Sequence, residues 1–179
     1  MRRTAKWALF VLGLIILFSV SFIYFQRLFR AKAKNEPPIF PPSALNKPLP
    51  KAHLVDVTGA ELDYAELRTG KVVLVLVSEG CHPCLEEAKF LATVVSLRDD
   101  VHFYGIIPFG ADRSVLKSAE AKFPFKLYFD EGGILGGTFH VDKVPIKLYV
   151  EGGILKGGWG GATTSDAKQA EFRRWLASV

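Results

Sequence analysis

Cysteine is scarce in this chain, and one whole segment lacks acidic residues. Only two cysteines occur among 179 residues, at positions 81 and 84. A structural zinc site uses four ligands, and one C-x-x-C pair supplies only two of them. Residues 1–34 contain no aspartate or glutamate, although they contain seven lysines and arginines. The cysteine pair and this basic N-terminal segment are therefore the two most informative features of the sequence.

The charge distribution argues against a nucleic-acid surface. The formal net charge is +5, but residues 1–34 alone carry +7. The remaining chain has 16 basic and 18 acidic side chains (23 minus 7, against 18), a net of −2. The basic residues flank a hydrophobic run, which favours contact with phospholipid headgroups over contact with nucleic acid.

The run Trp7–Phe25 is predicted to be a transmembrane helix. It holds 19 residues without a charge, and at 1.5 Å per residue it just spans a bilayer core of roughly 30 Å. A cleaved signal peptide would have a hydrophobic region of about 7–15 residues before a small-residue cleavage site. Here the A-x-A match that follows the run, Ala31-Lys32-Ala33, lies in a basic cluster. We therefore expect residues 1–30 to form an uncleaved, single-pass anchor.

The side of the membrane on which the domain lies is predicted from its cysteine chemistry and not from the charges that flank the hydrophobic run. Three basic residues precede the hydrophobic run and four follow it, so the positive-inside rule does not set an orientation. A short N-terminal tail and cysteine chemistry favour an extracytoplasmic domain. The expected location is the cell inner membrane with the domain facing the periplasm.

Residues 31–50 are predicted to be a spacer between anchor and domain. They contain six prolines, which favour extended polyproline geometry and semi-rigid linkers. Residues 51–179 then remain for one globular domain, a usual domain size.

The patterning of the domain predicts an α/β fold with a mixed β-sheet flanked by helices. A small hairpin is expected over residues 53–64, and a continuous β-branched run, typical of a doubly buried strand, follows at 71–77. Helices and strands then alternate, and a last helix carries one apolar stripe. The further expected strands are 101–107, 126–129, 146–150 and 154–159, and the expected helices are 82–97, 114–122 and 165–178.

Cys81 and Cys84 follow the buried strand and begin the first long helix. The C-x-x-C spacing places one sulfur at the helix N-terminus and the other one turn later, close enough for a disulfide. Exposed N–H groups and the helix dipole favour negative charge there, so Cys81 is expected to ionise more easily than a free thiol. We interpret the pair as a redox-active disulfide that needs no bound organic cofactor. An inert disulfide would close too small a loop to stabilise much.

Other readings of the pair remain open. A metal-binding or copper-delivery protein would use both cysteines and one of four scattered histidines. A peroxidase is disfavoured because it wants a lone peroxidatic cysteine with a threonine and an arginine nearby.

Three neighbouring residues are candidates for tuning the cysteines. Pro83 suits the first helical turn, where a missing N–H is tolerated. Protonated His82 would stabilise the thiolate and make the disulfide more oxidising. Glu87 follows Cys84 by three residues and falls within the apolar arc of the helix. A partly desolvated carboxyl there is a candidate base for deprotonating Cys84.

These motifs resemble the thioredoxin fold, and specifically its membrane-anchored TlpA/ResA-like thiol–disulfide oxidoreductases. The resemblance covers roughly residues 53–178 and is carried by three motifs. They are Gly70-Lys71-Val72-Val73-Leu74-Val75, Cys81-His82-Pro83-Cys84 with Glu87, and Asp130 with Val144-Pro145 before Glu151-Gly152-Gly153. The family usually has an aromatic residue before the first cysteine, where this chain has Gly80.

The resemblance implies roles for single residues. Cys81 would attack, Cys84 would resolve the mixed disulfide, and Glu87 would match the active-site glutamate. Pro145 would be cis and face the sulfurs, and substrate backbone would pair beside Val144.

The implied function is thiol–disulfide exchange with protein dithiols and disulfides, as a reductase or a maturation factor for cytochrome c or a similar envelope protein. A membrane electron donor or acceptor is the second expected partner. The alternatives are a disulfide donor and a maturation factor of the kind that serves methylamine dehydrogenase.

Overall fold

The computed structural model describes residues 17–22, 24–25, 42–78, 80–108 and 113–179. The chain divides into two compact units, Met1–Pro38 and Ile39–Val179. The described residues of the first unit are helical. No helix within the described residues is both long and apolar enough to cross a membrane, and most of the predicted span 7–25 lies outside them.

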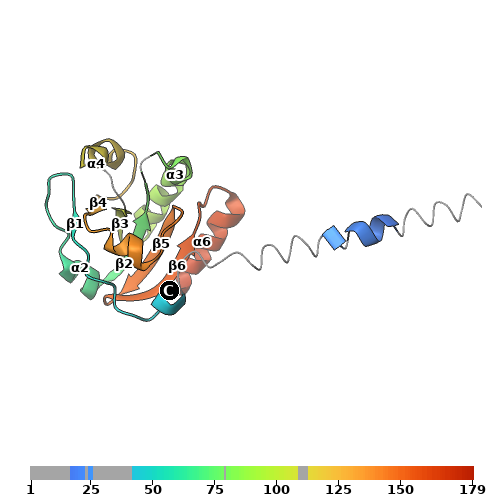
Figure 1. The fold of residues 1–179 in the computed structure, drawn as a ribbon, viewed down its shortest axis with the longest axis horizontal. Coiled ribbons are helices and arrows are strands. Elements are labelled where there is room, and N and C mark those ends of the chain that lie inside the picture. Colours follow the sequence, from blue (N-terminus) through green and yellow to red (C-terminus); the bar gives the residue numbers. More distant parts are fainter. Residues whose placement is uncertain (1–16, 23, 26–41, 79, 109–112) are drawn as a thin grey trace, which may run out of the picture. The chain divides into compact units, whose positions relative to one another are not determined.

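The second unit contains a mixed sheet flanked by helices (Figure 1), as its sequence predicts, and six strands of this sheet lie within the described residues. The strand order is β1-β4-β3-β2-β5-β6. Strands β2, β3 and β4 are parallel to one another, whereas β1, β5 and β6 run antiparallel to their neighbours. The strands are β1 (Leu54–Val55), β2 (Lys71–Leu76), β3 (His102–Ile107), β4 (Leu127–Asp130), β5 (Ile146–Glu151) and β6 (Ile154–Gly160).

Strand β2 is central and buried on both faces, which explains its unbroken β-branched run. Side chains alternate between the faces of a strand, so its even-numbered and odd-numbered residues enter different cores. Leu74 packs with one cluster of buried side chains, and Val73 and Val75 pack with the other.

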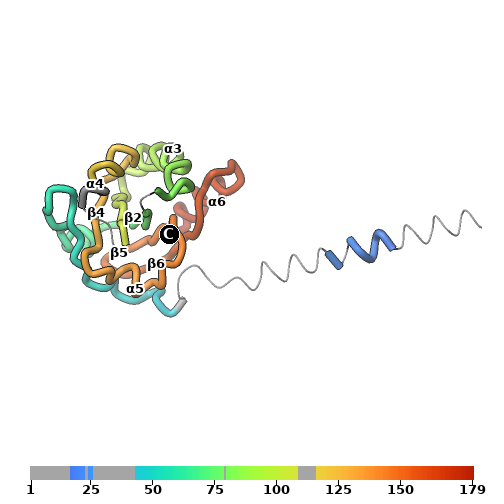
Figure 2. The backbone as a smooth tube through the Cα atoms, turned by 45° about the horizontal axis from the view of Figure 1, so that its top comes forward, coloured from blue at the N-terminus to red at the C-terminus, as the bar shows by residue number. Residues whose placement is uncertain are grey.

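Helices α3 (His82–Leu97), α4 (Arg113–Glu120) and α6 (Asp166–Ser178) cover one face of the sheet. They add Leu91, Leu116 and Phe172 to the core that contains Val73. Figures 1 and 2 both place α3 and α6 side by side, and the rings of Phe90 and Phe172 meet between them at 5.8 Å. Helices α2 (Tyr64–Thr69) and α5 (Ile134–Thr138) contribute to the core on the opposite face.

Helix α2 begins at the last residue of the predicted hairpin over residues 53–64, whose pairing is shorter than expected. Only Leu54–Val55 forms a strand, and Val55 makes a single bridge with Glu61. The chain then turns into a helix because the Asp63 carboxylate accepts a hydrogen bond from the Ala65 N–H, a standard N-cap. With six residues and one buried leucine, this helix has too little periodicity to be predicted.

Helix α5 is also absent from the sequence prediction, since two of its five residues are glycines. Tertiary contacts form it instead. The buried Asp130 carboxylate accepts hydrogen bonds from the N–H groups of Leu135 (2.7 Å) and Gly136 (3.4 Å), and Leu135 is fully buried.

Part of the predicted spacer is folded onto the domain. Residues 31–41 lie outside the described residues, but the segment from η1 (Pro42–Ala44) onwards packs against the edge of β6. The Asn46 N–H donates to the Leu155 carbonyl, and the Leu49 N–H donates to the Gly153 carbonyl, each at 2.8 Å. Leu49 is buried, so apolar side chains between the prolines anchor this stretch.

Candidate functional site

Cys81 and Cys84 form a disulfide at the start of α3, directly after the central strand. Gly80 precedes them with φ +69°, a left-handed conformation that a side chain rarely adopts. This conformation accounts for glycine at the position where the resembled family usually has an aromatic residue. Cys81 is the N-cap residue of the helix, and Pro83 lies in its first turn.

The two sulfur atoms occupy unequal environments. Cys84 is fully buried, whereas Cys81 is partly exposed. The Cys84 N–H points at the Cys81 Sγ at 3.2 Å. Helix N-terminal N–H groups stabilise negative charge, so the geometry favours a thiolate on the accessible Cys81.

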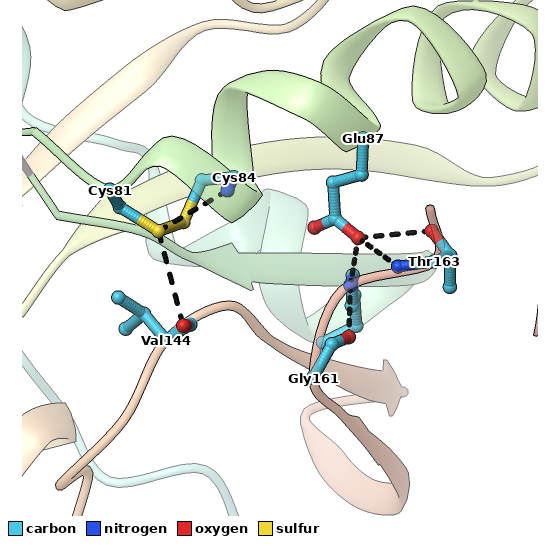
Figure 3. A network of polar contacts seen from close by, with 7 residues as sticks. Cys81, Cys84, Glu87, Val144, Gly161 and Thr163 are labelled. Carbon is cyan, nitrogen blue, oxygen red and sulfur yellow. Dashed lines mark hydrogen bonds and ion pairs between the residues drawn. A yellow bond between two sulfur atoms is a disulfide. The ribbon is translucent and has the colours of Figure 1, made fainter. Parts of the chain in front are cut away.

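Val144 lies beside the disulfide, in the loop before β5. The Val144–Pro145 peptide bond is cis, as the resemblance implies. The Val144 carbonyl oxygen lies 3.9 Å from the Cys81 Sγ (Figure 3). A backbone carbonyl group of this loop therefore lies beside the accessible sulfur of Cys81.

Glu87 is buried in α3 one turn after Cys84, with 1% of its surface exposed. Its Oε2 atom accepts three hydrogen bonds, from Lys147 Nζ at 2.6 Å, the Thr163 N–H at 2.9 Å and the Thr163 hydroxyl at 3.0 Å. The prediction that this carboxyl is desolvated is correct. Its ion pair is a feature that the sequence analysis missed.

Lys147 projects from β5 to the same face of the sheet as α3 and is completely buried. Its Nζ donates to Glu87 and to the Gly161 carbonyl at 2.9 Å, and lies 5.8 Å from the centre of the Phe172 ring. Burial lowers the pKa of Lys147, and the adjacent Glu87 opposes part of that fall. One sequence signal pointed to this site, a lysine in the otherwise apolar strand 146–150.

Thr163 reaches the site from the connection between β6 and α6. Gly161 turns this connection with φ +79°, and its N–H donates to the Pro145 carbonyl at 2.9 Å. The connection therefore joins Pro145, Lys147 and Glu87 in one network. Figure 3 shows its residues Gly161 and Thr163 beside Glu87. Nothing in the local sequence distinguishes Thr163 from other loop threonines.

His82 and Pro83 lie at the surface beside the cysteines. The His82 side chain is 80% exposed, and its Nδ1 atom lies 3.5 Å from Glu86 Oε1. Within the described part of the chain, no three His, Cys, Asp or Glu side chains are grouped so that they would hold a metal ion.

The chain is similar to several solved structures of other proteins. No family model and no curated protein sequence matches the chain. Among solved structures, a secreted Mycobacterium tuberculosis disulfide oxidoreductase, described as homologous to E. coli DsbE, is 22% identical. The match covers 78% of this chain and all of that one, with a TM-score of 0.59.

Two further structures match over similar lengths. StoA from Bacillus subtilis is 16% identical over 74% of this chain and 98% of its own, with a TM-score of 0.55. The exposed lipoprotein thioredoxin of Streptococcus pneumoniae is 15% identical over 71% of this chain and 98% of its own, with a TM-score of 0.59. These neighbours are of the kind that the sequence motifs resemble. The chain therefore has the thioredoxin-like α/β fold, with its cysteine pair at the start of the helix after the central strand.

Proposed function

We propose that this protein is a membrane-anchored, extracytoplasmic thiol–disulfide oxidoreductase that exchanges two electrons with protein substrates through Cys81 and Cys84. One observation carries the proposal. The disulfide joins a partly exposed sulfur, placed under the N–H groups of a helix N-terminus, to a fully buried one. This asymmetry suits an attacking cysteine and a resolving cysteine.

In the reducing direction, the Cys81 thiolate attacks one sulfur of a substrate disulfide. The substrate S–S bond breaks, a mixed disulfide forms, and the other substrate sulfur leaves as a thiolate. Cys84 then loses its proton to Glu87 and attacks the Cys81 Sγ. The Cys81–Cys84 bond forms, the second substrate sulfur leaves, and two electrons have moved to the substrate. The oxidising direction is the reverse of these steps.

Val144 is proposed to pair with the substrate backbone, since its carbonyl oxygen lies beside the accessible sulfur. Pro145 shapes the loop that presents it. His82 and Pro83 are proposed to tune the stability of the Cys81 thiolate. The proposed physiological partners are an envelope protein, such as a cytochrome c precursor, and a membrane electron donor that keeps the cysteines reduced.

The test is a redox titration of the full chain in glutathione and dithiothreitol buffers, combined with mixed-disulfide trapping. We expect one two-electron transition, and we expect Cys84→Ala but not Cys81→Ala to accumulate a mixed disulfide with a protein substrate. A redox potential of about −270 mV for the cysteine pair supports a reductase, and a potential of about −120 mV supports a disulfide donor. Absence of a two-electron transition, with tight stoichiometric metal binding after reduction, would replace the proposal by metal delivery.

A further inference from the structure

The two oxygens of the Glu87 carboxylate are held very differently. Oε2 receives all three hydrogen bonds, from Lys147 and Thr163. Oε1 is buried and has no hydrogen-bond partner within the described part of the chain. Figure 3 shows the Glu87 oxygen without a hydrogen bond, Oε1, turned to the side on which Cys84 and Cys81 lie, away from Thr163. A buried carboxylate oxygen without a donor calls for an explanation, because such atoms are usually satisfied.

Few charged or titratable groups face this carboxylate. Cys84 precedes it by one turn on α3, and Lys147 meets it from β5. Lys168 on α6 repels the Lys147 charge and is the smallest of the causes that act on the pKa of Lys147. His82, at the start of α3, is mostly exposed to solvent. Within the described part of the chain, Lys147 is therefore the charged group that contacts Glu87 directly.

An ammonium group at 2.6 Å strongly favours the ionised form of a buried carboxyl. Without a partner, a carboxyl in this position would take up a proton instead of staying charged. A protonated Glu87 cannot accept the proton of Cys84. The ionised carboxylate that the resolving step requires thus depends on its contact with Lys147.

We propose that Lys147 is a positioning residue for thiol–disulfide exchange: together with Thr163 it holds Glu87 Oε2, keeps the carboxylate ionised and leaves Oε1 free to accept the Cys84 proton. This inference rests on the proposed function. The proton passes to Oε1 directly or through one water molecule. The resulting Cys84 thiolate attacks the Cys81 Sγ, and the sulfur bound to Cys81 leaves with the bonding electron pair.

The two exchange steps can be observed separately with 5,5′-dithiobis(2-nitrobenzoate) and the reduced full chain. Attack by Cys81 releases one coloured thiolate and forms a mixed disulfide. Attack by Cys84 on the Cys81 Sγ releases the second coloured thiolate. Stopped-flow measurement from pH 5 to 9 gives a rate for each step, so the resolving step is isolated from the first attack.

At pH 7 we expect Lys147→Met to slow the second release at least tenfold, in line with the usual 10²–10⁴-fold contribution of a general base. The contribution of the carboxylate is the ratio of the second-release rate with Glu87 to the rate with Glu87→Gln. In the Lys147→Met background, this ratio should reach half of its maximum at a higher pH than it does with Lys147 in place. Adding Glu87→Gln to Lys147→Met should slow the step less than twofold further at pH 7. The first release should change little in each variant.

Two variants keep the test decisive. Thr163→Val removes the hydroxyl donor but leaves the backbone N–H, and should move the pH profile in the same direction by less. It also serves if Lys147→Met does not fold. Lys126→Met is the matched control, because it breaks a 2.8 Å ion pair with Asp56 that lies two strands away from β2. It should leave both rates and the profile unchanged.

The possible outcomes distinguish a failure of the positioning role of Lys147 from a failure of the proposed function. If the first release occurs but the pH profile of the second is the same with and without Lys147, the positioning role is wrong and the proposed function stands. Independent, multiplicative effects of Lys147→Met and Glu87→Gln would also overturn the positioning role. If neither coloured thiolate is released by the folded, reduced protein, the proposed function itself fails.

Discussion

Glu87 and Lys147 lie 60 positions apart in the sequence and form an ion pair in which neither side chain is more than 1% exposed. Removing two charges from water is expensive, and their attraction offsets that expense only if both are present and hydrogen bonded. The pair is satisfied on the Oε2 side by Lys147 and Thr163 and on the Lys147 side by Glu87 and the Gly161 carbonyl. Loss of either side chain therefore leaves the other charge buried without its partner.

The first prediction concerns the stability of the oxidised protein. Lys147→Met leaves a carboxyl buried without its partner and should lower the free energy of unfolding by about 3–5 kcal/mol. The double variant Glu87→Met with Lys147→Met removes both charges, and should lie within about 1 kcal/mol of the natural chain. Urea denaturation measures both. Additive losses in the double variant would show that the two side chains do not act as a pair.

The second prediction is a dependence of stability on pH that arises at Asp56. Lys126 at 2.8 Å, together with hydrogen bonds from Thr58 and Ala60, holds the pKa of this carboxyl well below its ordinary value of 3.8. A depressed pKa stabilises the fold above the ordinary value, and this contribution is lost as the pH falls below it. Asp56→Asn should cost about 1–3 kcal/mol at pH 7 and progressively less below pH 4.

Urea unfolding curves at pH 7 and at pH 3 test this. Asp100→Asn is a suitable control, because Asp100 is paired with Arg98 at an exposed site where solvent screens the charges. Equal losses for Asp56→Asn at both pH values would contradict the assignment.

The third prediction concerns packing between β3 and β4. Gly105 lies opposite Leu127 in the sheet, and an added Cβ at Gly105 would lie 2.2 Å from the Leu127 Cδ2 and 2.9 Å from the Phe125 ring. Gly105→Ala should therefore destabilise the fold by about 1–3 kcal/mol. Gly137→Ala in α5 has open space and should be neutral or stabilising by up to about 1 kcal/mol. Thermal unfolding of the two variants should move in opposite directions or differ by several degrees.

The fourth prediction concerns the redox potential. A protonated His82 stabilises the Cys81 thiolate, so His82→Gln should make the potential more negative. Because this side chain is 80% exposed and its Nδ1 atom lies 3.5 Å from the Glu86 Oε1 atom, we expect a change smaller than about 30 mV. Glu86→Gln should make the potential more positive, since it removes a negative charge near the helix N-terminus. Equilibration with glutathione measures both, and shifts of the same sign would refute the electrostatic explanation.

Much of the site was predictable because its signals are local. The β-branched run of β2 predicts a doubly buried strand, and the spacing of Cys81, Pro83 and Cys84 predicts a disulfide at a helix N-terminus. The three-residue spacing from Cys84 to Glu87 places the carboxyl on the buried side of the same helix. Each inference needs only the periodicity of one element and its cap.

The structure alone decided which groups meet Glu87. Lys147 comes from the next strand of the sheet beside β2 and Thr163 from a loop 76 residues later, and no local pattern encodes those contacts. Helix α5 and the packing of Leu49 against β6 were missed for the same reason, because tertiary partners stabilise segments whose own propensities are weak. The sequence by itself therefore determined the cysteine pair and the element that carries it. The charge of the buried acid beside that pair depended on how distant strands came together, since a buried charge is stable only where its partner arrives.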